Sequence, residues 1–127
     1  MLVLFFARGL VGHPYSGPMK ILGWNCRGIC NVSTIRSLKA LIRGHNCQVI
    51  FLSETKASES RMRKVVELIG FSDHVCVGVR GIAGDVCMLW SNVVKVEVLE
   101  FNALTIVMKV NDCFCSWALI GFYGPTY

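Results

Sequence analysis

The spacing of apolar and polar residues predicts a strand, a helix, a strand and a second helix in the first half of the chain. Met19–Trp24 is mostly apolar and is followed by the polar Asn25, which is typical of a strand that ends at a loop. Asn31 or Ser33 then suits the N-cap of a helix that runs to about Gly44. The apolar residues of this helix fall at helical spacing, at Ile35, Leu38, Leu41 and Ile42.

The second strand and helix follow the same order. Val49–Leu52 is a continuous apolar run, which predicts a strand buried on both faces, and it ends in the polar residues 53–56. Ser58 or Ser60 begins a helix that continues to Ile69, and Gly70 provides its C-terminal stop. Its apolar stripe consists of Met62, Val65, Val66 and Ile69.

Strand-like segments separated by turn residues fill the rest of the chain. They are Val75–Val79, Val86–Trp90, Val94–Phe101, Leu104–Val110 and Phe114–Phe122. We therefore expect a mixed α/β (α+β) fold with mostly antiparallel sheets and two helices. Residues 1–18 begin with an apolar run that is too short to span a bilayer. We interpret them as an N-terminal extension that precedes one domain over residues 19–127.

Composition and charge narrow the function classes. The chain has 127 residues, of which 54% are hydrophobic and 17% charged, which excludes a disordered protein. The formal net charge is +5, and residues 20–64 hold nine basic residues against two acidic ones, Glu54 and Glu59. This local excess favours a polyanion such as nucleic acid. The alternative is that the basic residues form two solvated helix faces.

The cysteine pattern indicates reduced thiols. The chain has seven cysteines, an odd number, and several lie inside apolar runs. We interpret them as buried thiols of an intracellular protein, because a disulfide framework normally uses an even number. No paired C-x2-C motifs occur and the histidines are scattered, so the sequence does not predict a zinc site.

Asn25 and Glu54 are the candidate site residues that the pattern itself suggests. Each follows an apolar strand of a strand–helix–strand unit, and such strands run parallel, so their carboxyl ends meet at one edge of the sheet. A carboxylate there can hold Mg²⁺, and an amide beside it can orient a phosphate oxygen. By spacing alone, a carboxylate such as Glu54 at a strand end is more often a helix cap or a surface residue, and Asn25 is more often a turn residue.

Four short segments resemble the endonuclease/exonuclease/phosphatase (DNase I-like) superfamily in their order and spacing. They are ILGWNCRG at 21–28, FLSETK at 51–56, CMLW at 87–90 and GFYGP at 121–125. The sequence is most similar to the endonuclease domains of plant LINE-type (non-LTR) retrotransposons, and the resemblance covers Met19 to Tyr127. It implies a four-layered α/β sandwich, of which this chain is the N-terminal part. It also implies Mg²⁺-dependent cleavage of phosphodiester bonds in DNA.

The resemblance also implies roles for individual residues. Glu54 matches the metal-binding glutamate, Asn25 the active-site asparagine, and Tyr123 the aromatic hydroxyl group near the scissile phosphate. Arg27 and Lys56 are basic neighbours that we expect to contact the nucleic-acid backbone. Tyr123 has an alternative as a core residue at a strand end. From the cysteine pattern and the lack of a convincing signal peptide or transmembrane segment, we expect an intracellular, nuclear protein with no membrane association. We expect no stable protein partner.

The sequence departs from the family pattern in ways that affect activity. Ile29–Val32 replaces the usual glycine and proline, and no segment matches the family's G-D-F-N-like and S-D-H-like motifs. These would supply the Asp, Asn and His groups around the attacking water, so we expect the chain to be inactive by itself. The same missing part would cover the opposite sheet, so we also expect exposed apolar faces and unpaired strand edges that make the chain unstable or prone to aggregation. The competing hypotheses are a nuclease fragment, a phosphatase fragment of the same superfamily, and a non-catalytic remnant that binds nucleic acid weakly. The last would use Arg36, Lys39, Arg43, Arg61, Arg63 and Lys64.

Overall fold

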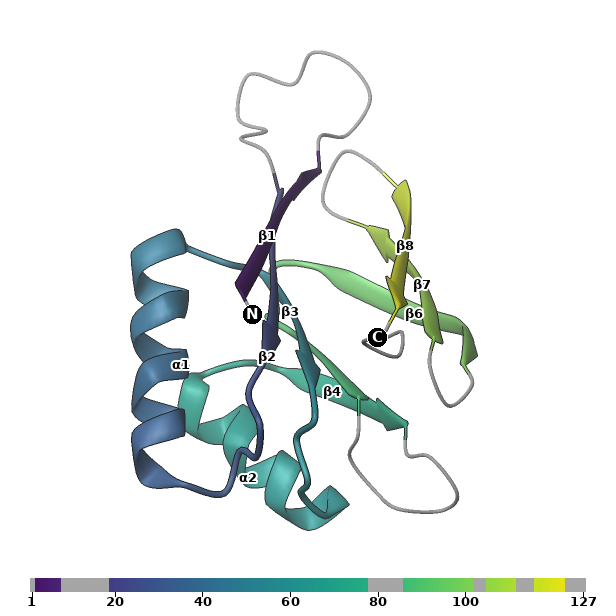
Figure 1. The fold of residues 1–127 in the computed structure, drawn as a ribbon. Coiled ribbons are helices and arrows are strands. Elements are labelled where there is room, and N and C mark those ends of the chain that lie inside the picture. Colours follow the sequence, from purple (N-terminus) through teal and green to yellow (C-terminus); the bar gives the residue numbers. More distant parts are fainter. Residues whose placement is uncertain (1, 8–18, 78–85, 102–104, 112–115, 123–127) are drawn as a thin grey trace, which may run out of the picture.

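The computed structural model describes residues 2–7, 19–77, 86–101, 105–111 and 116–122, and they form a mixed α+β fold. Two helices cover one face of a five-stranded sheet, and a three-stranded sheet packs on its other face (Figure 1). The described residues thus make three layers, in the order helices, first sheet, second sheet. The prediction of a mixed α+β fold with two helices and mostly antiparallel sheets is confirmed for these residues.

The first sheet has the strand order β1-β2-β3-β5-β4. Its strands are β1 (Leu2–Ala7), β2 (Met19–Asn25), β3 (Val49–Ser53), β5 (Val86–Trp90) and β4 (Asp73–Val77). β2 and β3 pair in parallel, as the strand–helix–strand pattern predicted, while β5 is antiparallel to both of its neighbours. The second sheet is an antiparallel meander of β6 (Lys95–Phe101), β7 (Thr105–Asn111) and β8 (Ser116–Phe122).

The helices begin and end where the sequence predicted. Helix α1 (Val32–His45) starts after Asn31, whose side-chain oxygen accepts a hydrogen bond from the Ser33 backbone N–H at 2.8 Å. Helix α2 (Glu59–Ile69) starts after Ser58 and ends at Gly70, whose φ of 77° lies in the left-handed region that glycine adopts without strain. Polar caps and a glycine stop therefore define both ends of α2.

Alternate residues of the central strands enter two different cores. On β3, Ile50 and Leu52 pack against the helices, while Val49 packs against the second sheet. β5 follows the same rule, with Leu89 toward the helices and Met88 toward the second sheet. A strand covered on both faces requires apolar residues at every position, which explains the continuous apolar runs in the sequence.

Residues 2–7 differ from the expected role of the N-terminal segment. β1 pairs with β2 along its whole length, from Leu2 opposite Trp24 to Ala7 opposite Met19. The segment 1–18 was interpreted as an extension ahead of the domain, yet six of its residues supply an edge strand of the first sheet. An isolated apolar run of this length does not reveal its partner, because strand pairing is decided by tertiary contacts.

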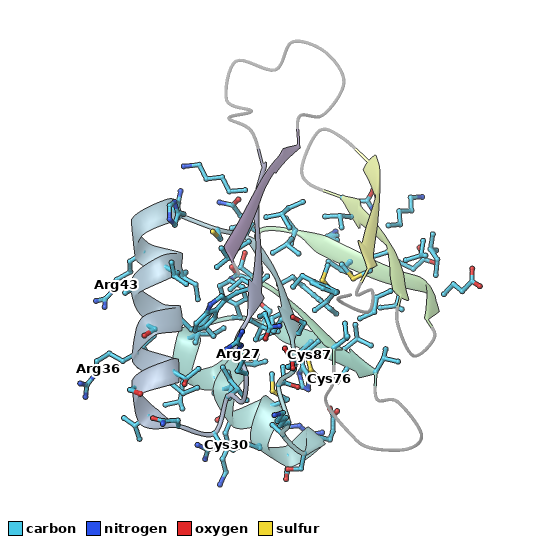
Figure 2. The ribbon with its side chains drawn as sticks, in the orientation of Figure 1. Arg27, Cys30, Arg36, Arg43, Cys76 and Cys87 are labelled. Atoms are coloured by element: carbon cyan, nitrogen blue, oxygen red, sulfur yellow. A yellow bond between two sulfur atoms is a disulfide. The ribbon has the colours of Figure 1, made fainter. Side chains whose placement is uncertain are left out.

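The prediction that the cysteines are reduced is wrong for one pair. Cys76 on β4 and Cys87 on β5 lie directly opposite each other, with their Cα atoms 4.2 Å apart, and form a disulfide (Figure 2). Among the other cysteines in the described part of the chain, Cys26 and Cys47 are buried free thiols and Cys30 is an exposed one. The bonded pair is separated by 11 residues. Only the strand register brings the two together.

Candidate functional site

The carboxyl ends of β2 and β3 bring the two central candidate residues together. Asn25 is the last residue of β2 and pairs with Ser53, the last residue of β3, so Glu54 is the next residue beyond this pair. Both Asn25 and Glu54 are half-buried. The prediction that Asn25 and Glu54 stand at the carboxyl ends of two neighbouring parallel strands is therefore confirmed.

Backbone hydrogen bonds continue the parallel ladder beyond the strand ends and join the two loops. The N–H of Cys26 donates to the carbonyl of Ser53 at 3.1 Å, and the N–H of Gly28 donates to that of Glu54 at 2.7 Å. A third bond runs from the N–H of Ile29 to the carbonyl of Thr55 at 2.9 Å. These bonds hold the two loops side by side, so Asn25 and Glu54 are positioned before any ligand binds.

Left-handed backbone conformations are concentrated in the same two loops. Arg27 and Lys56 each have a φ of 49°, and Glu54 has a φ of 55°. Gly28, with a φ of 102°, is the residue here for which such a conformation carries no steric penalty. Non-glycine residues in this region are uncommon, and they are often found where a loop positions functional groups.

The polar groups at this edge are suited to a cation and a phosphate. The side-chain oxygen of Asn25 accepts a hydrogen bond from the Arg27 N–H at 3.2 Å, which leaves its amide NH₂ group as a donor. The carboxylate of Glu54 takes part in no salt bridge with the described residues, so it can serve as an oxygen ligand. Arg27 and Lys56 are exposed on the two loops.

Cys26 packs beneath this edge and is not suited to be a nucleophile. Its thiol is buried and lies 3.3 Å from the carbonyl oxygen of Ser53, to which it donates a hydrogen bond. Burial raises the pKa of the Cys26 thiol, and the charge of Glu54 acts in the same direction. A thiol held neutral in this way packs as a small apolar group.

The basic residues of the two helices have more than one role. Arg36 and Arg43 are exposed on α1 and point away from the sheet (Figure 2). Arg61 instead donates from Nη2 to the carbonyl of Cys30 at 2.9 Å, which ties α2 to the loop after β2. Arg63 and Lys64 are exposed on α2. Tyr123 lies outside the described residues.

A second group of chemically active side chains was missed from the sequence. Glu59, His74 and Cys76 place one ligand atom each within 4.8 Å of the others. The sequence contains no metal-ligand spacing for them, since Glu59 lies on a helix and the other two on a strand. The alternation of His74 and Cys76 along a strand was the only available signal, because residues two apart share one face.

No protein-family model matches the chain, and no curated protein matches it significantly. Neither of the two helices in the described part of the chain is long and apolar enough to cross a membrane.

Proposed function

We propose that the chain supplies the metal- and phosphate-binding edge of a Mg²⁺-dependent endonuclease of the DNase I-like type, similar to those of plant LINE-type retrotransposons. The observation that carries this proposal is the position of Asn25 beside Glu54 at the carboxyl edge of two parallel strands, joined by hydrogen-bonded loops. A DNA substrate agrees with the net charge of +5 and with the exposed Arg27 and Lys56.

In this proposal each residue has a distinct task. The carboxylate of Glu54 would hold Mg²⁺, which when bound would supply a Lewis acid for a phosphate oxygen and for a water molecule. The amide of Asn25 donates to a phosphate oxygen, while Arg27 and Lys56 hold the flanking backbone. The family's Asp, Asn and His motifs have no match in this sequence. We therefore expect the chain by itself to bind metal and DNA without cutting.

Metal binding is the direct test. Mn²⁺, a spectroscopic substitute for Mg²⁺, is titrated into the chain with a short DNA duplex present, and bound Mn²⁺ is read by electron paramagnetic resonance. We expect Glu54→Gln to weaken binding at least tenfold, by the loss of one charged ligand. Glu67→Gln, which makes the same charge change at an exposed position of α2, is the control. Equal binding by wild type and Glu54→Gln would contradict the proposal.

Hydrolysis assays separate the related activities. Supercoiled plasmid and inositol phosphates are each incubated with the full chain and Mg²⁺, with chelator as the blank. Nicking that disappears in Glu54→Gln would mean that the chain itself is a catalyst, against our expectation. Phosphate release from the inositol phosphates, again lost in Glu54→Gln, would replace the nuclease with a phosphatase.

A second candidate function is metal-independent nucleic-acid binding by the outer face of α1. The exposure and outward direction of Arg36 and Arg43 favour it (Figure 2). Each phosphate contact contributes a slope of about −0.9 to the dependence of log affinity on log salt. If α1 binds DNA, the double variant Arg36→Gln/Arg43→Gln should reduce that slope by about 2, while Arg27→Gln/Lys56→Gln leaves it unchanged. The endonuclease proposal expects the reverse.

A further inference from the structure

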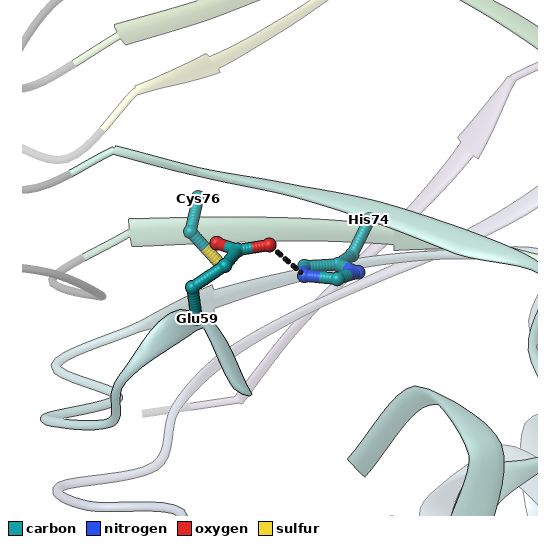
Figure 3. A group of neighbouring side chains, drawn as sticks. All are labelled: Glu59, His74 and Cys76. Carbon is teal, nitrogen blue, oxygen red and sulfur yellow. Dashed lines mark hydrogen bonds and ion pairs between the residues drawn. The ribbon is translucent and has the colours of Figure 1, made fainter. Parts of the chain in front are cut away.

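Three potential metal ligands converge between α2 and the edge strand β4. Glu59 is the first residue of α2, and His74 and Cys76 occupy alternate positions on β4, so both face the helix (Figure 3). Their ligand atoms all lie within 4.8 Å of one another, and Glu59 Oε1 is 2.8 Å from His74 Nε2. These residues are distinct from the Asn25–Glu54 edge, so the inference below is independent of the proposed function.

The donor set selects the kind of metal. A nitrogen, a carboxylate oxygen and a sulfur are the ligands of Zn²⁺, whereas Mg²⁺ does not take thiolates. In a tetrahedral zinc site with bonds of about 2.0–2.3 Å, the ligand atoms are roughly 3.3–3.6 Å apart. Glu59 Oε1 and His74 Nε2 are now 2.8 Å apart and share a hydrogen bond. If zinc took the place of the bonding proton, these two atoms would move apart by less than an ångström.

Burial favours this adjustment. The side chain of His74 is only 6% exposed, whereas that of Glu59 is 57% exposed. A buried imidazole offers a fixed ligand, and an exposed carboxylate has room to rotate toward an ion. The open fourth position of the tetrahedron would be taken by water.

The disulfide decides whether the third ligand is available. Cys76 is bonded to Cys87, and a disulfide sulfur is not the thiolate that zinc requires. We propose that the chain binds one Zn²⁺ through Glu59, His74 and Cys76 when the disulfide is reduced, and that zinc and the disulfide exclude each other.

A dithiol reductant supplies the two electrons and two protons that convert the Cys76–Cys87 disulfide into two thiols. The S–S bond breaks as two electrons pass from the dithiol, which forms its own disulfide, and its two protons move to the sulfurs of Cys76 and Cys87. Zn²⁺ then displaces the proton of Cys76 to solvent. Cys87 stays as a buried thiol beside the hydroxyl of Thr55, whose Oγ1 lies 3.7 Å from its Sγ.

Each state attaches β4 to a different neighbour. The disulfide joins β4 to β5 within the sheet, whereas zinc would join β4 to α2 through Glu59. Among the described strands, β4 ends the order of the first sheet and pairs with β5 alone, so it relies on such links more than a central strand does. Zinc binding would therefore replace one link to this strand with another when the chain is reduced.

Cobalt titration tests the proposal on the full chain. The chain is reduced with dithiothreitol, separated from it without oxygen, and titrated with Co²⁺, whose thiolate complexes absorb strongly in the near ultraviolet. We expect one equivalent of Co²⁺ to bind with this absorption and Zn²⁺ to displace it. The oxidised chain should bind at least tenfold more weakly and without the thiolate band. Equal spectra for the reduced and oxidised chains would overturn the proposal.

Substitutions identify the ligands. Cys76→Ser should remove the thiolate band and His74→Ala should weaken binding at least tenfold. Cys30→Ser, which removes an exposed free thiol elsewhere, should change neither. Cys87→Ser frees Cys76 without a reductant, so this variant should bind Co²⁺ as isolated. An unchanged band in Cys76→Ser, or loss of the band in Cys30→Ser, would assign the metal to other residues.

Alkylation of the wild-type chain provides a test that does not depend on any variant folding. Zn²⁺ should slow the reaction of Cys76 with iodoacetamide at least tenfold in the reduced chain, as read by mass spectrometry of its peptide. The rate at Cys30 should stay the same. Equal rates at Cys76 with and without Zn²⁺ would exclude this cysteine as a ligand.

Discussion

Replacing Glu54 with glycine should make the protein more stable while removing the proposed metal ligand. Glu54 has a φ of 55°, in the left-handed region, and its carboxylate forms no salt bridge with the described residues. A non-glycine residue in this conformation costs about 1–2 kcal/mol relative to one in a right-handed conformation. No salt bridge to the described residues offsets this cost, in agreement with the proposed role of the carboxylate in holding a metal ion.

The magnitude follows from two opposing terms. Glycine removes the left-handed penalty of about 1–2 kcal/mol, but its greater freedom in the unfolded chain costs about 0.5–1 kcal/mol. The backbone bond from the Gly28 N–H to the carbonyl of residue 54 is retained, because it does not involve the side chain. Glu54→Gly should therefore raise the free energy of unfolding by up to about 1.5 kcal/mol, with a central value of roughly 0.75 kcal/mol, or Tm by roughly 3 °C.

Urea unfolding followed by circular dichroism measures this change. Ser53→Gly is the matched control, because Ser53 is the adjacent residue and lies in an extended strand. This variant should lower the free energy of unfolding by about 0.5–1 kcal/mol. The Mn²⁺ titration is run on the same samples. If Glu54→Gly lowers the free energy of unfolding, the side chain makes stabilising contacts, and the argument that its strained conformation is kept for binding is refuted.

Three further changes test the packing, the helix start and the buried thiol. Leu52→Ala should lower the free energy of unfolding by about 2–5 kcal/mol in chemical denaturation, because Leu52 is fully buried against the helices. Leu68→Ala, at an exposed position, should lower it far less. Asn31→Ala should lower stability by about 1 kcal/mol, by loss of the N-cap bond to Ser33, and Asn31→Ser should recover most of it. Because burial raises the folded-state pKa of Cys26, the unfolded chain ionises first, so the free energy of unfolding should fall as pH rises above the ordinary thiol value of 9.0. In Cys26→Ala the free energy of unfolding should depend less on pH, as shown by urea midpoints measured below and above pH 9.0. If the variant shows the same pH dependence as the wild type, another group causes it.

The local elements were predictable because their causes lie close together in the sequence. The α1 prediction rested on Asn31 and on apolar residues at helical spacing, and the helix indeed runs over Val32–His45. The apolar run at β3 indicated a strand covered on both faces, and its residues enter two cores. Asn25 and Glu54 were brought together by the general geometry of a parallel strand pair.

What the sequence by itself determined is therefore the order of the elements, their caps and one edge of the first sheet, since each depends on residues that are neighbours along the chain or on strand alternation. Only the tertiary structure decided that residues 2–7 pair with β2, that Cys76 meets Cys87, and that Glu59 approaches His74. Strand register and helix docking set these contacts through many weak apolar interactions spread over both cores. No local pattern records that sum, so pairings between distant residues become visible only in the folded chain.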